Sequence, residues 1–178
     1  MREHFLLDTG PLQEFFVLRY QAESNRRWPD QTFQFHALLT PLDQEDFRRF
    51  VEANRGHLGT SSGVVMEMHR FLRGAEDRCH SQQAQQDLRR RFWGLVCATF
   101  REVGIAEHTV PVVDVAEQVL VDLGPVDAGL LELAKRSVKH IGRLVVLTAD
   151  RRLLELCLQH EVPAEYVSDR LEKFRKTG

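Results

Sequence analysis

His4-Phe5-Leu6-Leu7-Asp8-Thr9-Gly10-Pro11 is the stretch of sequence that decides the fold. An uninterrupted apolar run is typical of a strand that is buried on both faces, and the turn-forming residues from Asp8 to Pro11 end it. From Leu12 to Tyr20 the apolar residues recur at helical spacing, which predicts a helix. A strand, a tight turn and a helix form the first part of a β–α–β unit, so we expect a parallel sheet.

The same alternation continues along the chain. We expect strands at 4–7, 57–61, 109–113, 144–147 and 163–167, and helices at 12–20, 41–54, 64–73, 81–103, 124–140 and 151–160. A further short helix is predicted after Asp114, because Glu117 completes a capping box with it. The pattern predicts an α/β fold with a central parallel sheet of about five strands and helices on both faces.

A chain of 178 residues, 43% of them hydrophobic, is long enough for one full core. We therefore expect a single domain over 1–178, with an insertion or extended helical segment at about 21–56, where residues 21–40 are polar and irregular. Trp28 lies in that stretch, where it either packs against the domain or stacks on a nucleic-acid base.

Composition excludes several classes of protein. The 24 basic and 26 acidic residues give a formal net charge of -2, so overall charge does not mark a nucleic-acid binder, although a local basic rim is compatible with it. The three cysteines are far apart, which argues against zinc and disulfides. We see neither a signal peptide nor an apolar run near the roughly 20 residues that span a bilayer, and we expect a cytoplasmic protein without membrane contact.

Four carboxylates occur where strands end or helices begin. Asp8 and Asp150 follow the predicted strands at 4–7 and 144–147, and Glu67 and Asp127 each interrupt the apolar stripe of a predicted helix. Each acid also has an ordinary explanation: Asp8, Asp127 and Asp150 could cap or stabilise helix starts, and Glu67 could pair with an arginine such as Arg70. Capping alone does not require the four to meet in space.

If the four acids do meet, their mutual repulsion raises some of their pKa values, and a divalent cation would relieve it. An all-oxygen donor set suits Mg²⁺ or Mn²⁺ and does not suit zinc. Such ions lower the pKa of a bound water and stabilise a leaving oxygen, which is the chemistry of metal-dependent phosphodiester hydrolysis.

The residues around the four acids resemble the motifs of PIN-domain nucleases, in the same order along nearly the whole chain. The matching stretches are Leu6 to Leu12, Val64 to Arg70, Gly124 to Ala128 and Leu147 to Asp150. Two departures from the compact members are the long stretch from Tyr20 to Arg55 and the absence of an acid shortly after Asp150, where Leu153 and Leu154 stand.

The resemblance implies a Rossmann-like sheet and a VapC-like endoribonuclease that cleaves RNA. It implies that Asp8, Glu67, Asp127 and Asp150 are catalytic metal ligands for Mg²⁺ or Mn²⁺, supported by the hydroxyls of Thr9 and Thr148. Homodimers are common in the family, and many compact members are the toxins of toxin–antitoxin pairs, which makes an antitoxin protein a candidate partner.

Arg151 and Arg152 follow Asp150 directly and are predicted to contact RNA phosphates. The competing interpretation is a non-catalytic PIN-fold module that binds RNA or protein. Two other strand–Asp proteins fit less well. Aspartyl phosphatases need a second Asp where Gly10 stands, and dinucleotide-binding domains need a glycine-rich turn that Asp8-Thr9-Gly10-Pro11 does not supply.

Overall fold

The computed structural model describes residues 3–25, 39–141 and 143–177. The described strands are β1 (His4–Leu7), β2 (Leu58–Ser61), β3 (Ile105–His108), β4 (Leu144–Thr148) and β5 (Ala164–Tyr166). The described helices are α1 (Thr9–Ser24), α2 (Pro41–Ala53), α3 (Ser62–Glu76), α4 (Gln82–Thr99), the π-helical turn η1 (Phe100–Gly104), the 3-10 turn η2 (Val112–Asp114), α5 (Glu117–Leu123), α6 (Pro125–Ile141), α7 (Arg151–Gln159) and α8 (Val167–Thr177).

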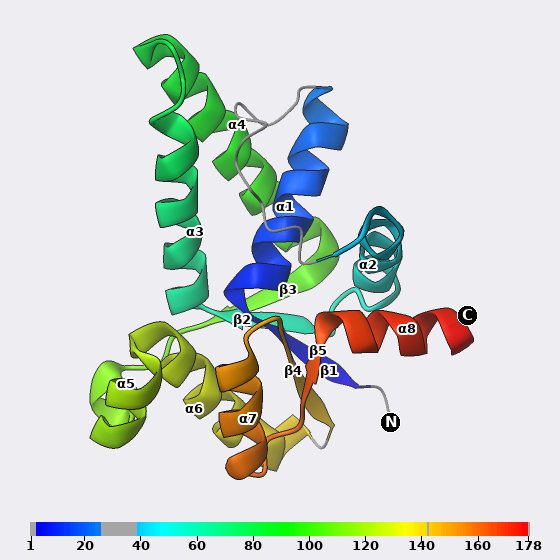
Figure 1. Ribbon diagram of the computed structural model, residues 1–178, viewed down its shortest axis with the longest axis vertical. Helices are drawn as coiled ribbons and strands as arrows, with labels where there is room; N and C mark the ends of the chain where they lie inside the picture. The colour runs from blue at the N-terminus through cyan, green and yellow to red at the C-terminus, as the bar shows by residue number, and fades with distance from the viewer. Residues whose placement is uncertain (1–2, 26–38, 142, 178) are drawn as a thin grey trace.

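The five described strands form one parallel sheet in the order β3-β2-β1-β4-β5, which confirms the predicted α/β fold (Figure 1). Strand β1 lies in the centre and pairs with β4 over its full length, from His4 opposite Leu144 to Leu7 opposite Leu147. The chain moves to one side from β1 to β3 and then crosses back to β4. The carboxyl ends of β1 and β4 therefore lie side by side at the point where the direction of winding changes, which is where open α/β sheets bind ligands.

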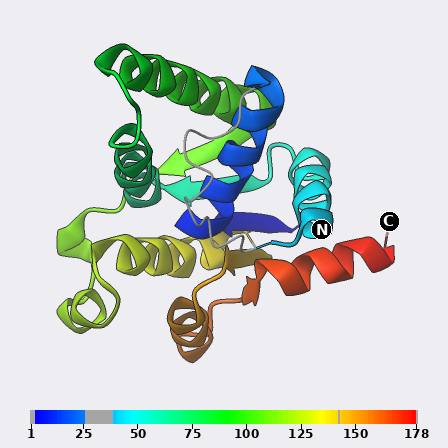
Figure 2. The same ribbon diagram turned by 45° about the horizontal axis from the view of Figure 1, so that its top comes forward.

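Helices cover both faces of the sheet, as the sequence predicts. Helices α6 and α7 pack on one face, and α1, α2, α4 and α8 lie on the other, as Figures 1 and 2 show. Strand β4 is buried at every position because it lies between these layers, and its sequence is accordingly almost entirely apolar. Helices α1 and α2 contribute the phenylalanines Phe15, Phe16, Phe47 and Phe50 to the core.

The predicted third strand at 109–113 was wrong. The strand there is β3, over Ile105–His108, and it is followed by the turn η2. β3 is an edge strand on which only Ile105 is buried, so it lacks the apolar run that marks the inner strands. The apolar residues that suggested a strand, Val112 and Val113, are exposed.

The predicted capping box of Asp114 was also wrong. Helix α5 begins after Ala116, which makes no side-chain cap, whereas Asp114 ends η2 and pairs with Arg136 of α6 at 3.3 Å. The long helix predicted at 81–103 ends at Thr99 and changes to the π-helical turn η1, which Gly104 closes with a φ of 72°. That left-handed backbone is readily available to glycine.

The C-terminal helix α8 was not predicted. Its sequence is mostly charged, and only Val167 and Leu171 of the helix are buried. It is held to α2 by Arg175, which pairs with Asp43 and Asp46, and by the edge-to-face contact of Phe174 with Phe50. The stretch at about 21–56 thus includes a helix that packs within the domain, while Trp28 lies outside the described residues.

Candidate functional site

Asp8 stands at the end of β1 and is 5% exposed. Both of its carboxylate oxygens accept hydrogen bonds: Oδ1 accepts the backbone N–H of Thr9 at 2.6 Å, and Oδ2 accepts the hydroxyl hydrogen of Thr148 at 2.6 Å. Burial raises the pKa of Asp8, the two hydrogen bonds oppose that change, and the charges of Asp150 and Glu67 add to it. The carboxylate is therefore held in one orientation at an electrostatic cost.

Thr148 connects the ends of the two central strands. Its side chain is fully buried, and its hydroxyl both donates to Asp8 and accepts the backbone N–H of Asp150 at 2.8 Å. Asp150 is the N-cap of α7, because its Oδ1 accepts the N–H groups of Arg152 and Leu153 at 2.6 and 3.1 Å. Asp150 therefore has the capping role that was the alternative explanation for it. The hydroxyl of Thr148 also links its backbone to the carboxylate of Asp8.

Glu67 reaches Asp8 through Thr9. The hydroxyl of Thr9 donates to Oε2 of Glu67 at 2.7 Å, while the N–H of the same threonine donates to Asp8. Glu67 is half-buried in the second turn of α3. Its alternative explanation, an ion pair with Arg70, is absent from the ion pairs of the described residues.

Asp127 lies in the first turn of α6, half-buried. The starts of α3 and α6 adjoin, since a Cβ at Gly63 would lie 3.5 Å from the Cα of Val126. Burial, followed by the charges of Asp8, Glu67 and Asp150, raises the pKa of Asp127 to about 7. Four acids from distant parts of the sequence thus act on one another electrostatically at this edge of the sheet.

The four acids do not share a single coordination point as they stand. Within residues 3–25, 39–141 and 143–177, no group of three or more His, Cys, Asp and Glu side chains is arranged to hold a metal ion. The donors are nevertheless of the kind that Mg²⁺ and Mn²⁺ prefer. Asp150 is the exposed member, and its Oδ1 is engaged in capping α7. In donor type and in shared negative charge, the set fits a hard divalent cation.

The two arginines after Asp150 are both exposed but differ in their contacts. Nε of Arg151 pairs with Glu155 at 2.8 Å, one turn along α7. Arg152 makes no side-chain ion pair with the described residues, although its backbone N–H donates to Asp150. The guanidinium of Arg152 is therefore the freer of the two.

Cys157 is a neighbour of the acids that the sequence interpretation missed, because it reads simply as a core residue of α7. It is fully buried, and burial raises the pKa of its thiol to about 12, with added contributions from the charges of Asp8 and Asp127. The thiol is therefore neutral at physiological pH.

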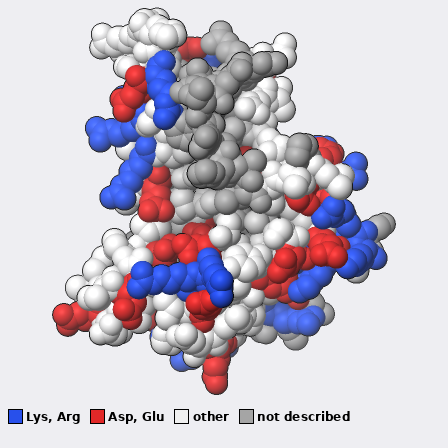
Figure 3. Space-filling model, viewed as in Figure 1, with Lys and Arg blue, Asp and Glu red and all other residues white. Residues whose placement is uncertain are grey.

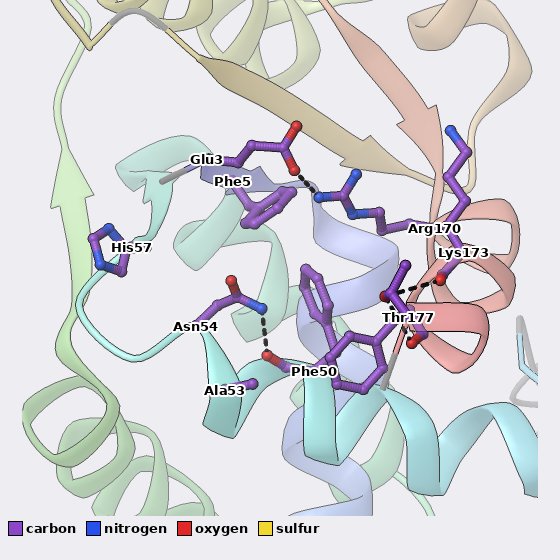
Figure 4. Close-up of a pocket in the computed structure, with 10 residues that line it drawn as sticks. Glu3, Phe5, Phe50, Ala53, Asn54, His57, Arg170, Lys173 and Thr177 are labelled. Carbon is purple, nitrogen blue, oxygen red and sulfur yellow. Dashed lines mark hydrogen bonds and ion pairs between the residues drawn. The ribbon is translucent and has the colours of Figure 1, made fainter. Parts of the chain in front are cut away.

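A pocket of about 470 Å³ lies at the opposite, amino-terminal edge of the sheet (Figure 4). Phe5, Phe50 and Phe174 line it, and the guanidinium of Arg170 lies 4.6 Å from the centre of the Phe5 ring. Arg170 is already paired with Glu3, and the dashed line in Figure 4 marks this contact. Glu3 thus neutralises the charge of Arg170 in this pocket, so we place the candidate site at the four acids.

No family model matches the chain, and neither the curated proteins nor the solved structures include a match. None of the helices in the described parts of the chain is both long and apolar enough to cross a membrane.

Proposed function

We propose that this chain is a divalent-metal-dependent endoribonuclease that hydrolyses RNA phosphodiester bonds at Asp8, Glu67, Asp127 and Asp150. The observation that carries the proposal is the hydrogen-bond chain at the ends of β1 and β4, in which Thr148 donates to Asp8 and Thr9 links Asp8 to Glu67. Burial and then the charges of the three other acids raise the pKa of Asp127, which agrees with this arrangement. Acids used only as helix caps have no need to lie within electrostatic reach of one another. A site that concentrates negative charge in this way is a recognised mark of function.

The hydrogen-bond chain gives these residues distinct tasks in that proposal. Thr9 and Thr148 each donate to a carboxylate, so they fix the orientation of Glu67 and Asp8 before any ligand arrives. A bound Mg²⁺ or Mn²⁺ would supply Lewis acidity and a water of lowered pKa. In hydrolysis the water oxygen bonds to phosphorus and the water gives up a proton. The bond from phosphorus to the leaving sugar oxygen breaks, and that oxygen takes up a proton.

The test is cleavage of a single-stranded RNA, with and without Mg²⁺ or Mn²⁺, by the wild-type chain and by Asp8→Asn. We expect metal-dependent cleavage by the wild type and a loss of at least 100-fold in the variant. Asp77→Asn is the matched control, because Asp77 is an exposed acid at the far end of α3. Calorimetric titration with Mn²⁺ in the same three proteins measures binding independently of turnover.

Asp8→Asn should change the stability of the protein little, because the removal of a buried charge offsets the loss of one of the two hydrogen bonds that Asp8 accepts, which an amide nitrogen cannot accept. Full activity in Asp8→Asn would overturn the proposed mechanism. RNA binding without cleavage under any metal condition would favour the non-catalytic PIN-fold module instead. Pairing with an antitoxin and homodimer formation are further proposals that follow from the resemblance alone.

A further inference from the structure

Arginines of α3, α4 and α7 differ in whether a carboxylate engages them. Arg89 is engaged by Glu76, and Arg91 by Asp87, both on α4. By contrast, Arg70 on α3 and Arg152 on α7 are exposed and form no ion pair with any residue that the structure describes. Arg73 on α3 is also exposed and without an ion pair among those residues, although its charge acts on Glu76. The unengaged guanidinium groups are those able to take an external anion.

Two of the unengaged arginines flank the acids from different elements. Arg70 lies one helical turn beyond Glu67 on α3, a spacing that places side chains on neighbouring positions of the helix surface. Arg152 lies in the first turn of α7, where its backbone N–H donates to Asp150. In Figure 3, basic side chains lie along the outer side of α3 and beside the start of α7, with acidic side chains between them.

This distribution of charge suits a chain of phosphates better than a single phosphate. Acids alone repel a polynucleotide, so cations on each side are needed to hold phosphates that flank the acidic centre. We propose that Arg70 and Arg152 bind backbone phosphates on opposite sides of the cleavage point of a single-stranded polynucleotide, and that Arg73 extends the α3 side. This inference rests on the proposed function, and it selects Arg152 over Arg151 as the principal phosphate contact on α7.

The experiment measures binding of a fluorescent single-stranded RNA, in EDTA so that no cleavage occurs, over a series of salt concentrations. Each phosphate contact contributes roughly 0.7 to the slope of log K against log[salt] for a single strand. We expect Arg70→Gln and Arg152→Gln each to lower the slope by about that amount, and the double variant to lower it by about twice as much. Arg151→Gln should have a smaller effect, because Glu155 holds that side chain.

Arg143→Gln is the matched control. Arg143 is an exposed arginine just before β4, at the amino-terminal edge of the sheet, and its nearest acid, Glu3, is 3.9 Å away. Arg143→Gln changes the net charge by the same amount as the test variants but should leave the slope of log K against log[salt] unaltered. If the contacts are to the backbone, each variant should lower the slope of log K against log[salt] for a DNA strand of the same sequence by as much as it does for RNA.

Equal slopes for Arg70→Gln and Arg143→Gln would overturn the α3 side of the proposal, and equal slopes for Arg152→Gln and Arg143→Gln would overturn the α7 side. Absence of binding by the wild type to either strand would overturn both. Cleavage is measured separately with Mg²⁺ or Mn²⁺. A failure of the nuclease proposal therefore shows as binding without turnover, whereas a failure of this inference shows as turnover or binding that is insensitive to the two arginines.

Discussion

Thr148, at the end of β4, donates its hydroxyl hydrogen to Oδ2 of Asp8, at the end of β1, over 2.6 Å. This hydrogen bond joins two residues that are 140 positions apart in the sequence, and both are nearly removed from water. It lies at the switch in strand order, where β1 and β4 are neighbours. The orientation of the most buried acid of the candidate site therefore depends on a pairing of strands.

Thr148→Val tests that dependence. Valine keeps the shape of threonine but removes the donor to Asp8 and the acceptor for the Asp150 N–H. We expect Mn²⁺ affinity and RNA cleavage to fall about 10- to 100-fold, and stability to fall by about 1–3 kcal/mol. Thr148→Ser retains the hydroxyl and should restore most of the metal affinity. If valine and serine gave the same metal affinity, the hydroxyl would have no positioning role.

Glu14 should make the stability of the protein depend on pH near neutrality. It is 1% exposed between α1 and α2, its Oε1 accepts from Gln44 at 3.2 Å, and Oε2 has no hydrogen-bond partner among the described residues. Burial raises its pKa from 4.5 to about 7, the hydrogen bonds from Gln44 and the Leu39 backbone oppose this, and the charge of Asp43 adds to it.

A raised carboxyl pKa means that the folded state holds the proton more tightly than the unfolded state. The stability contributed by protonated Glu14 is therefore full below pH 4.5 and is lost as pH rises through about 7, by on the order of 3 kcal/mol at most. Glu14→Gln mimics the protonated form and should be the more stable protein at pH 8. Urea unfolding at pH 5.5 and pH 8 measures the difference, with the exposed Glu107→Gln as control. An unchanged pH dependence in Glu14→Gln would refute this assignment.

The ion pair between Glu76 and Arg89 should stabilise the protein more at neutral than at acidic pH, which is the opposite of the effect of Glu14. Glu76 of α3 is 5% exposed, and Nε and Nη2 of Arg89 on α4 donate to its two oxygens at 2.8 and 2.7 Å. The hydrogen bonds from Arg89 lower the pKa of Glu76, so this stabilisation is present above the ordinary carboxyl pKa of 4.5 and is lost as pH falls.

Arg89→Met leaves the Glu76 charge nearly buried without its partner. Because Arg89 itself is half exposed, we expect a loss of about 1–3 kcal/mol, below the range for a fully buried pair. Arg91→Met breaks an exposed pair on the same helix and should cost less than about 1 kcal/mol. Urea denaturation at pH 7 compares the two variants. Equal losses would show that the Glu76 pair behaves as a surface pair.

The three cysteines should react with a maleimide in the order of their exposure. Cys97 is exposed, Cys79 is partly buried with a raised pKa, and Cys157 is fully buried with a pKa of about 12. Since the thiolate is the reactive form, Cys157 should label only when the protein unfolds. Mass spectrometry of peptides after timed labelling, with and without urea, gives the order. Rapid labelling of Cys157 in the native protein would contradict its full burial.

The central strands and the helices next to them could be predicted from the sequence because short stretches of it carry their apolar patterns. The apolar runs at His4–Leu7 and Leu144–Thr148 mark strands buried on both faces, and the helices that follow them show helical apolar spacing. The edge strand β3 and the charged helix α8 could not be found in the same way, because each buries few residues and so leaves a weak pattern.

The sequence by itself determined that acids follow the central strands and begin the helices, since those positions are set by local propensity and by the end of each apolar run. Only the tertiary structure decided which acids are neighbours. The order β3-β2-β1-β4-β5 brings Asp8 and Asp150 together, and the contact between the starts of α3 and α6 brings Glu67 and Asp127 to them. Local periodicity carries no information on strand order, which follows from the packing of helices on two faces of one sheet.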